Sequence, residues 1–345
     1  MSILNTTRRI LASTALVAGL ALAASPSQAQ QANLDAVTRN FVNAVTAAGG
    51  APIYTLSPQA ARDVLSGAQA GPVAKQPADI QDISFPTGPL GSVSVRIVRP
   101  QGVSEALPVV MYFHGGGWML GGKDTHDRLI REIAVGARAA VVFVDYRRTP
   151  DVVYPVPNEE AYAATKYVVD NAKALNVDAA RLAVAGDSAG GNMAAAITLL
   201  AKDRNGPKIS HQVLFYPVTD DIAQNSSYAA YGNGPWLTVN AMHFFLDAHY
   251  PASVRKDALA FPLKASVQQL KGLPSATVIV AENDLLRDEG EAYARKLEEA
   301  GVSVASTRYN GAIHDFVMLN GLADSPATRA AIDQANTALQ RAFRR

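Results

Sequence analysis

A glycine–serine turn in this sequence has the spacing of a catalytic nucleophile motif. Residues 186–191 read Gly-Asp-Ser-Ala-Gly-Gly and directly follow the apolar run 182–185. The small neighbours of Ser188 permit the strained backbone angles that a nucleophile adopts on a sharp strand-to-helix turn. The helix predicted to follow would direct its N-terminal N–H groups at a developing oxyanion. Ser188 is therefore the candidate nucleophile, and the absence of cysteine excludes a thiol nucleophile.

A second glycine-rich segment, His114-Gly115-Gly116-Gly117-Trp118, follows the apolar run 109–113. Consecutive glycines let the backbone approach a reacting carbonyl and present N–H groups to it. A phosphate-binding loop is disfavoured, because no Gly-Lys-Ser/Thr or G-x-G-x-x-G pattern opens a helix at this point. We expect His114 to be structural and to shape the loop through a ring hydrogen bond, because the base follows the nucleophile in this chain order.

A serine nucleophile needs a histidine to take its proton and a carboxylate to orient that histidine. The histidines that follow the serine are His211, His243, His249 and His314. His211 precedes a predicted strand, at the wrong edge of the sheet, and the next two fall in a long insertion. His314 lies in the loop between the last predicted strand and a helix, at the catalytic edge. We therefore choose His314 as the candidate base.

Three carboxylates are candidates for the acid that orients the base. Asp284 follows the predicted strand 277–280 and is our choice, while Glu282 and Asp220 are rivals that the residues alone leave open. Asp288 lies at the start of a predicted helix, and we expect it to cap that helix.

The elements that would position these groups are apolar runs alternating with helical patterns. Predicted strands cover residues 92–98, 109–113, 140–144, 182–185, 213–216, 277–280 and 304–308. Predicted helices cover residues 127–137, 159–175, 189–202, 288–300 and 327–343. Short continuous apolar strands alternating with helices indicate an α/β fold with a mostly parallel central sheet and helices on both faces.

About 60 residues separate the strand ending near Tyr216 from the next strand at Thr277, more than one crossover requires. This insertion is aromatic, with Tyr228, Tyr231, Trp236, Phe244, Phe245 and Tyr250. Its residues Met242, Phe245, Leu246 and His249 recur at helical spacing and predict an amphipathic helix. We expect a lid over the strand ends, where open parallel sheets place their sites.

Composition narrows the function further. The 345 residues carry 31 Lys+Arg against 30 Asp+Glu, and only 18% are charged, which disfavours a nucleic-acid or anionic-membrane binder. A hydrophobic share of 48% supplies ample material for a core and argues against disorder. Without cysteine there are no disulfides and no Cys-ligated zinc or iron–sulfur centres.

Residues 1–29 have the layout of a secretory signal peptide. Arg8 and Arg9 precede the apolar run 10–24, and the small residues of Ser27-Gln28-Ala29 predict cleavage after Ala29. The apolar run of about 15 residues is shorter than the roughly 20 that span a bilayer, so no stable membrane anchor is expected. We predict a periplasmic or secreted protein, exported by general secretion rather than the twin-arginine route.

The order Ser188, Asp284, His314 is that of α/β-hydrolases, and the sequence resembles the hormone-sensitive-lipase family of bacterial esterases. The resemblance extends over about residues 90–320. The motifs that carry it are at residues 114–118, 145–147, 154–157, 186–191, 261–263, 284–290 and 314–316. It implies an α/β-hydrolase fold and Asp284 as the acid. It also implies oxyanion N–H groups from Gly115, Gly116 and Ala189, and a helical cap built from about residues 30–77 and 220–257.

We therefore expect a secreted serine carboxylesterase that acts on short-to-medium acyl esters through an acyl-enzyme. No metal or cofactor is implied, and the expected partner is a small-molecule ester. An amidase or peptidase on the same triad, and a non-catalytic ligand-binding module on this fold, are the alternatives. The sequence does not decide between a monomer and a homodimer.

Overall fold

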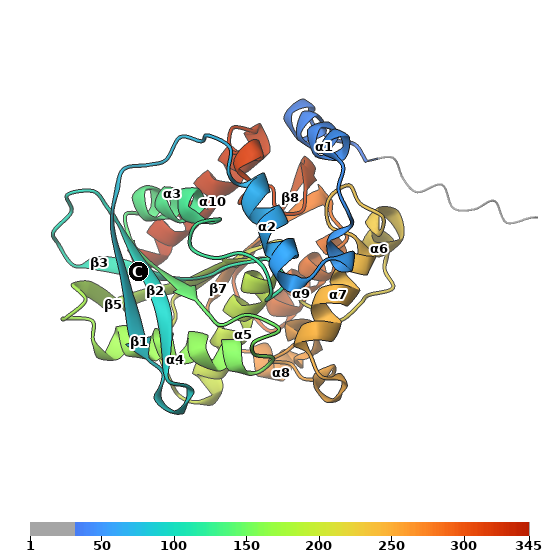
Figure 1. Cartoon of the computed structure of the whole chain (residues 1–345). Coiled ribbons are helices and arrows are strands. Elements are labelled where there is room, and N and C mark those ends of the chain that lie inside the picture. Colours follow the sequence, from blue (N-terminus) through green and yellow to red (C-terminus); the bar gives the residue numbers. More distant parts are fainter. Residues whose placement is uncertain (1–31, 345) are drawn as a thin grey trace, which may run out of the picture.

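An eight-stranded sheet lies at the centre of the computed structural model, in which residues 32–344 are described (Figure 1). The strands are β1 (Ala78–Pro86), β2 (Ser92–Pro100), β3 (Leu107–Phe113), β4 (Ala140–Asp145), β5 (Val177–Asp187), β6 (His211–Phe215), β7 (Ser275–Asn283) and β8 (Val304–Ile313). The helices are α1 (Ala36–Ala48), α2 (Pro58–Ala68), α3 (Asp127–Ala137), α4 (Val156–Asp170), α5 (Ala189–Asp203), α6 (Ser226–Tyr231), α7 (Val239–His249), α8 (Val267–Leu270), α9 (Arg287–Glu299) and α10 (Pro326–Phe343). The expected signal peptide, residues 1–29, lies outside the described residues.

The strand order is β1-β2-β4-β3-β5-β6-β7-β8. The six strands from β4 to β8 in this order are parallel to one another, whereas β2 pairs antiparallel with β4 and β1 pairs antiparallel with β2. This arrangement confirms the predicted α/β fold. All the predicted strands are present, whereas β1 was not predicted. Because β5, β7 and β8 run in the same direction, their carboxyl ends meet at one edge of the sheet, where the candidate site residues follow them.

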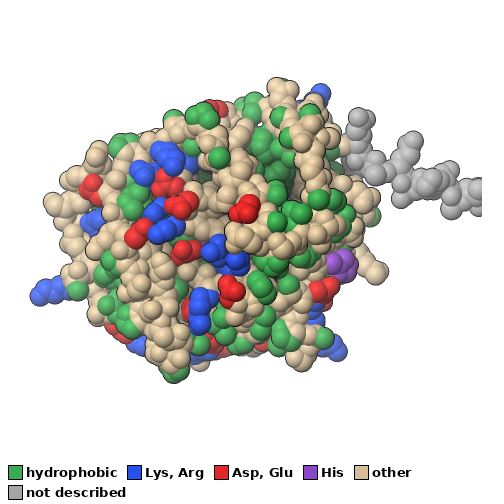
Figure 2. Space-filling model, in the orientation of Figure 1, with side chains coloured by type: hydrophobic (Ala, Val, Ile, Leu, Met, Phe, Trp, Pro, Cys, Tyr) green, Lys and Arg blue, Asp and Glu red, His purple; other side chains and the backbone are tan. Residues whose placement is uncertain are grey.

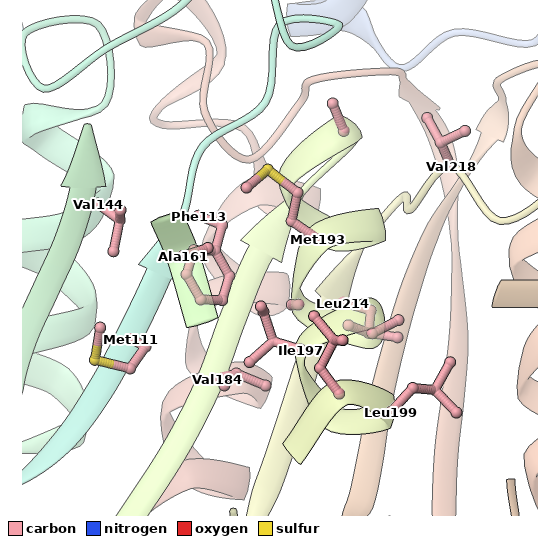
Figure 3. Packing of buried hydrophobic residues seen from close by; sticks show 14 of the residues in the cluster. Met111, Phe113, Val144, Ala161, Val184, Met193, Ile197, Leu199, Leu214 and Val218 are labelled. Carbon is pink, nitrogen blue, oxygen red and sulfur yellow. The ribbon is translucent and has the colours of Figure 1, made fainter. Parts of the chain in front are cut away.

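Helices cover both faces of the sheet, as the continuous apolar strands predicted. Within β3, Val109, Met111 and Phe113 face a cluster that includes α4, α5 and α9, whereas Val110 and Tyr112 face α3 and α10. Figure 3 shows part of the first cluster, with Met111, Phe113 and Val184 of the sheet and Met193 and Ile197 of α5 among its labelled side chains. The small residues of α5 let the helix lie close to the strands behind the serine turn.

Two segments far apart in the sequence lie over the carboxyl edge of the sheet, and together we call residues 32–77 and 220–257 the cap. Helices α1 and α2 come from the first segment, and α6 and α7 from the second (Figure 1). The turn Ile53–Thr55 between α1 and α2 contacts α7. Hydrophobic side chains gather around this region on the face shown in Figure 2.

The predicted amphipathic face of α7 is buried, with Met242, Phe245, Leu246 and His249 each at most 6% exposed. The prediction that Asp288 is the N-terminal capping residue of helix α9 is wrong. The helix begins at Arg287, so Asp288 lies inside its first turn. The Asp288 carboxylate instead accepts hydrogen bonds from the Ser226 hydroxyl at 2.5 Å and the Ser227 N–H at 2.8 Å, which joins α9 to the cap.

Candidate active site

Ser188 lies on a sharp turn between β5 and α5, with φ 54° and ψ −119°. A non-glycine residue in this region is strained, and its neighbours must hold it there. The Ser188 N–H donates to the Phe215 carbonyl at 2.9 Å. Gly190 packs so closely on the Phe113 carbonyl that no Cβ could be accommodated. The turn thus has the strained geometry that the small residues predicted.

The structure brings Ser188, His314 and Asp284 into one hydrogen-bonded row. His314 Nε2 lies 2.9 Å from the Ser188 Oγ, and His314 Nδ1 lies 2.7 Å from Asp284 Oδ2. The other Asp284 oxygen accepts the Leu286 N–H at 2.9 Å. Since the carboxylate accepts from Nδ1–H, the neutral imidazole keeps Nε2 free to accept the serine proton.

The pKa of His314 reflects two opposing influences. Burial alone would lower it, but the negative charges of Asp284 and Asp315, with the hydrogen bond to Asp284, outweigh burial and raise the pKa to about 9. The carboxylates therefore stabilise the imidazolium, which is the form that arises when the histidine takes a proton from a nucleophile.

The rival carboxylates point elsewhere. Glu282 accepts the Gly311 N–H at 2.7 Å, and Asp220 forms an ion pair with Lys264 at 2.5 Å. Neither bonds to the imidazole, so the geometry singles out Asp284.

The other downstream histidines also lie away from the serine. His211 begins β6 and bonds to the hydroxyls of Ser275 and Thr277, at the opposite edge of the sheet. His243 is exposed on α7. His249 is buried, stacks on Trp118 with an interplanar angle of 3°, and bonds to the Thr149 hydroxyl at 2.8 Å.

Gly115 requires a correction. It was expected to supply an oxyanion N–H, but that N–H donates to Asp187 Oδ1 at 3.1 Å and is not available to a substrate. Within residues 32–344, the N–H groups of Gly116 and Gly117 make no hydrogen bond, and both residues line the cavity at Ser188. Ala189 is the first residue of α5, so its N–H has no acceptor in the helix. Gly117 was missed because nothing in three consecutive glycines distinguishes which N–H is already bonded.

Asp187 is the centre of a buried polar network behind the glycine loop. It also accepts the Tyr112 hydroxyl at 2.6 Å and lies 3.3 Å from His126 Nε2. Burial alone would raise the pKa of Asp187, but His126 and the Tyr112 hydrogen bond outweigh it and keep the pKa below its ordinary value. The glycine loop is thus anchored to the residue that precedes the nucleophile.

His114 is structural, as expected. Its ring is fully buried, stacks on Tyr146 at 4.2 Å, and its Nδ1 lies 2.8 Å from the Gly115 carbonyl. Burial lowers the pKa of His114 to about 3, so the ring is neutral at physiological pH.

A cavity of about 270 Å³ lies above Ser188 and His314. Its walls come from the glycine loop and from both segments of the cap, which contribute Val45, Ile53, Tyr54, Leu65, Trp236, Met242 and Phe245. The lining is largely apolar. The ionisable side chains among the lining residues are those of Tyr54, His314 and Asp315. The Trp236 indole N–H donates to Asp315 Oδ2 at 2.9 Å, which connects the cap to the loop of the base.

The start of the cap braces the loops that carry the acid and the base. The Asn33 N–H donates to the side chain of Asn283, the residue before Asp284, at 3.1 Å. The Asp35 N–H donates to the Gly311 carbonyl at 3.2 Å, three residues before His314.

Within residues 32–344, no three His, Asp or Glu side chains are grouped as metal ligands. No helix in the same part of the chain has the length and apolarity needed to cross a membrane.

Comparisons with known proteins point in one direction. Residues 110–318 match a family model described as the alpha/beta hydrolase fold. Carboxylesterase NlhH of Mycobacterium tuberculosis is 41% identical over 256 residues, covering 74% of this chain and 80% of its own. The ethyl acetate hydrolase of Pseudomonas putida is 36% identical over 278 residues, covering 79% and 86%. The crystal structure of a thermostable esterase from Pseudomonas putida ECU1011 matches with a TM-score of 0.88 and 46% identity, over 90% of this chain and 98% of that one.

Proposed function

The chain belongs to the hormone-sensitive-lipase-like branch of the α/β-hydrolase family and is a carboxylic ester hydrolase, and we propose that it cleaves short-to-medium acyl esters through Ser188, His314 and Asp284. The observation that carries the proposal is the hydrogen-bonded row of these three side chains beneath the cavity, with distances of 2.9 and 2.7 Å.

In the proposed mechanism, Ser188 Oγ attacks the ester carbonyl while His314 Nε2 takes the serine proton. Asp284 holds Nδ1–H and stabilises the imidazolium. The tetrahedral oxyanion accepts hydrogen bonds from the N–H groups of Gly116, Gly117 and Ala189. His314 then protonates the leaving alcohol, which yields the acyl-enzyme.

Water completes the reaction. His314 takes a proton from a water molecule, which attacks the acyl carbonyl. The second tetrahedral intermediate collapses with cleavage of its bond to Ser188 Oγ, His314 returns the proton to that oxygen, and the carboxylic acid is released. No other group is required by this sequence of steps.

The size of the cavity supports the proposed substrate range. At about 270 Å³ it lies at or below the small end of typical ligand pockets, and its apolar lining suits an uncharged hydrocarbon chain. Turnover of p-nitrophenyl esters should therefore fall as the acyl chain grows beyond medium length. Faster turnover of an emulsified long-chain triglyceride than of a soluble short ester would contradict this range.

The mechanism is tested by Ser188→Ala with p-nitrophenyl butyrate as substrate. We expect kcat to fall by about 10³-fold or more, because the triad acts as a unit. A fluorophosphonate should label the wild type and not the variant. Ser306→Ala, at an exposed position of β8, serves as the control and should keep full activity. Esterase activity retained by Ser188→Ala refutes the mechanism.

We also propose that the protein is exported and loses residues 1–29. The charged start, the apolar run and the small residues before Gln30 support this. Expression in a bacterial host with N-terminal sequencing of the periplasmic protein should give a chain that begins at Gln30. An intact Met1 on active protein retained in the cytoplasm would argue against export.

A further inference from the structure

A single carboxylate interrupts the apolar lining of the cavity. Asp315 follows the base directly, and its side chain is 17% exposed. Among the described residues that line the cavity there is no lysine or arginine. A carboxylate in such surroundings loses hydration, and its cationic neighbour in the lining is His314 in its protonated form, so the charge is costly whenever His314 is neutral.

The position of Asp315 relative to the reacting atoms is well defined. Its Oδ1 lies 3.5 Å from His314 Nε2, the same nitrogen that lies 2.9 Å from the Ser188 Oγ. Because Nε2 must pass its proton to the leaving alcohol, a group beside Nε2 faces the alcohol half of a bound ester.

Support of the cap does not explain the charge. Asp315 Oδ2 accepts the Trp236 N–H, yet a neutral carboxamide oxygen at the same place would also accept that hydrogen bond. Stabilisation of the imidazolium comes first from Asp284, at 2.7 Å from Nδ1, with Asp315 as a more distant contributor at 3.5 Å from Nε2. What the Asp315 charge adds is negative potential at the alcohol side of the cavity, reinforced by the buried carboxylates of Asp187 and Asp284.

We propose that Asp315 selects substrates by the charge of their alcohol: esters of neutral alcohols are accepted, and esters whose alcohol carries an anionic group beside the scissile bond are rejected. This inference rests on the proposed function, since it assigns the alcohol class of the same site. A substrate anion would lie within several ångströms of Asp315 in a cavity of low polarity, where like charges repel strongly. We expect discrimination of roughly tenfold to a hundredfold in kcat/KM.

The test compares two compounds of the same shape, 2-(butanoyloxy)acetate and its neutral amide, 2-(butanoyloxy)acetamide. The wild type should cleave the amide-bearing ester with much the higher kcat/KM. Asp315→Asn keeps the acceptor for Trp236 and removes the charge, so it should reduce the ratio of the two constants by roughly tenfold or more. Burial raises the pKa of Asp315, so the assay is run at mildly alkaline pH, which favours the ionised carboxyl.

The matched control is Asp247→Asn, which changes the net charge equally on the cap helix α7. The Asp247 side chain is mostly exposed and pairs with Arg255 at 2.6 Å, outside the cavity lining. The control should leave the ratio unchanged. A general effect of Asp315→Asn on His314 would alter both substrates alike and leave the ratio unchanged.

A binding measurement separates failure of this inference from failure of the proposed function. Both compounds are titrated by NMR into Ser188→Ala and into the same protein carrying Asp315→Asn. The anionic compound should bind the double variant more tightly than it binds Ser188→Ala. The neutral compound should bind the two proteins with equal affinity. If the wild type cleaves neither these compounds nor p-nitrophenyl butyrate, the proposed function fails and the titration still decides the inference. An unchanged ratio, in turnover or in binding, overturns the inference.

Discussion

The Asp187 carboxylate accepts the N–H of Gly115 at 3.1 Å, so the residue before the nucleophile fixes the loop that faces it. Asp187 has no exposed surface, and its second oxygen lies near His126. The bond commits the first N–H of the glycine loop to the protein interior, which leaves the next two N–H groups for a substrate.

The first prediction follows from this bond. Asp187→Ala should lower kcat roughly 10- to 100-fold with little change in KM, because the loop loses the anchor that aims its donors at the oxyanion. Asp187→Asn retains an acceptor for Gly115 and should recover most of the loss. Steady-state kinetics on p-nitrophenyl butyrate make the comparison, and thermal unfolding verifies that both variants fold. If Asp187→Ala and Asp187→Asn lower kcat by the same factor and raise KM by the same factor, general disruption of the site would be the cause instead.

The second prediction concerns the pH dependence of the reaction. The base acts only when neutral, and its pKa is raised to about 9, so kcat/KM should rise about tenfold per pH unit up to that region. Asp315→Asn removes one of the charges that raise the pKa of His314, so the profile should move to lower pH. The profile is measured with an uncharged ester. A plateau that begins near pH 6.5, the ordinary value for histidine, would contradict the effect of the two carboxylates.

A third prediction concerns stability at low pH. Burial lowers the pKa of His249 from 6.5 to about 3. The unfolded chain therefore binds a proton below pH 6.5 that the folded chain does not bind until near pH 3, and the free energy of unfolding falls as the pH falls through this range. Between about pH 7.5 and pH 5 this one group should cost about 2 kcal/mol.

His249→Phe keeps a ring against Trp118 and cannot take up a proton. The stability difference between wild type and variant, from urea unfolding, should shift by about 2 kcal/mol in favour of the variant between those pH values. Comparing the two proteins cancels the contributions of His114 and of the buried acids. His243→Phe, at an exposed position of the same helix, is the control. A pH-independent difference for His249→Phe would disprove the assignment.

A fourth prediction concerns substrate length. Phe245 projects from α7 into the cavity and lies against Gly117. Phe245→Ala should enlarge the cavity and raise the activity on longer p-nitrophenyl esters relative to the butyrate by roughly tenfold. The neighbouring Phe244 does not line the cavity, so Phe244→Ala should leave the chain-length profile unchanged. If both variants shift the profile equally, loosening of α7 rather than the shape of the cavity is responsible.

The parallel part of the sheet could be predicted because its strands are buried on both sides and read as apolar runs, such as Val109–Phe113. β1 could not, because its residues are mostly exposed and include Asp79, Gln81 and Asp82. An edge strand of this kind shows little apolar pattern in the sequence, and its extended conformation is held by its pairing with β2.

The row of Ser188, Asp284 and His314 was predictable from chain order and from the strands that these residues follow. Two features depended on contacts that no local pattern reveals. The loss of Gly115 as a donor requires Asp187, 72 residues away, and the bond between Trp236 and Asp315 spans 79 residues. The sequence already favoured Asp284, but excluding Glu282 and Asp220 needed the positions of their partners, Gly311 and Lys264.

The bonds from Asn33 and Asp35 to the loops of the acid and the base have a consequence for folding. The Asn33–Asn283 bond joins residues that lie 250 positions apart in the sequence. Closing so long a loop costs conformational entropy, so we expect these loops to gain this support only after the sheet between the two segments has formed.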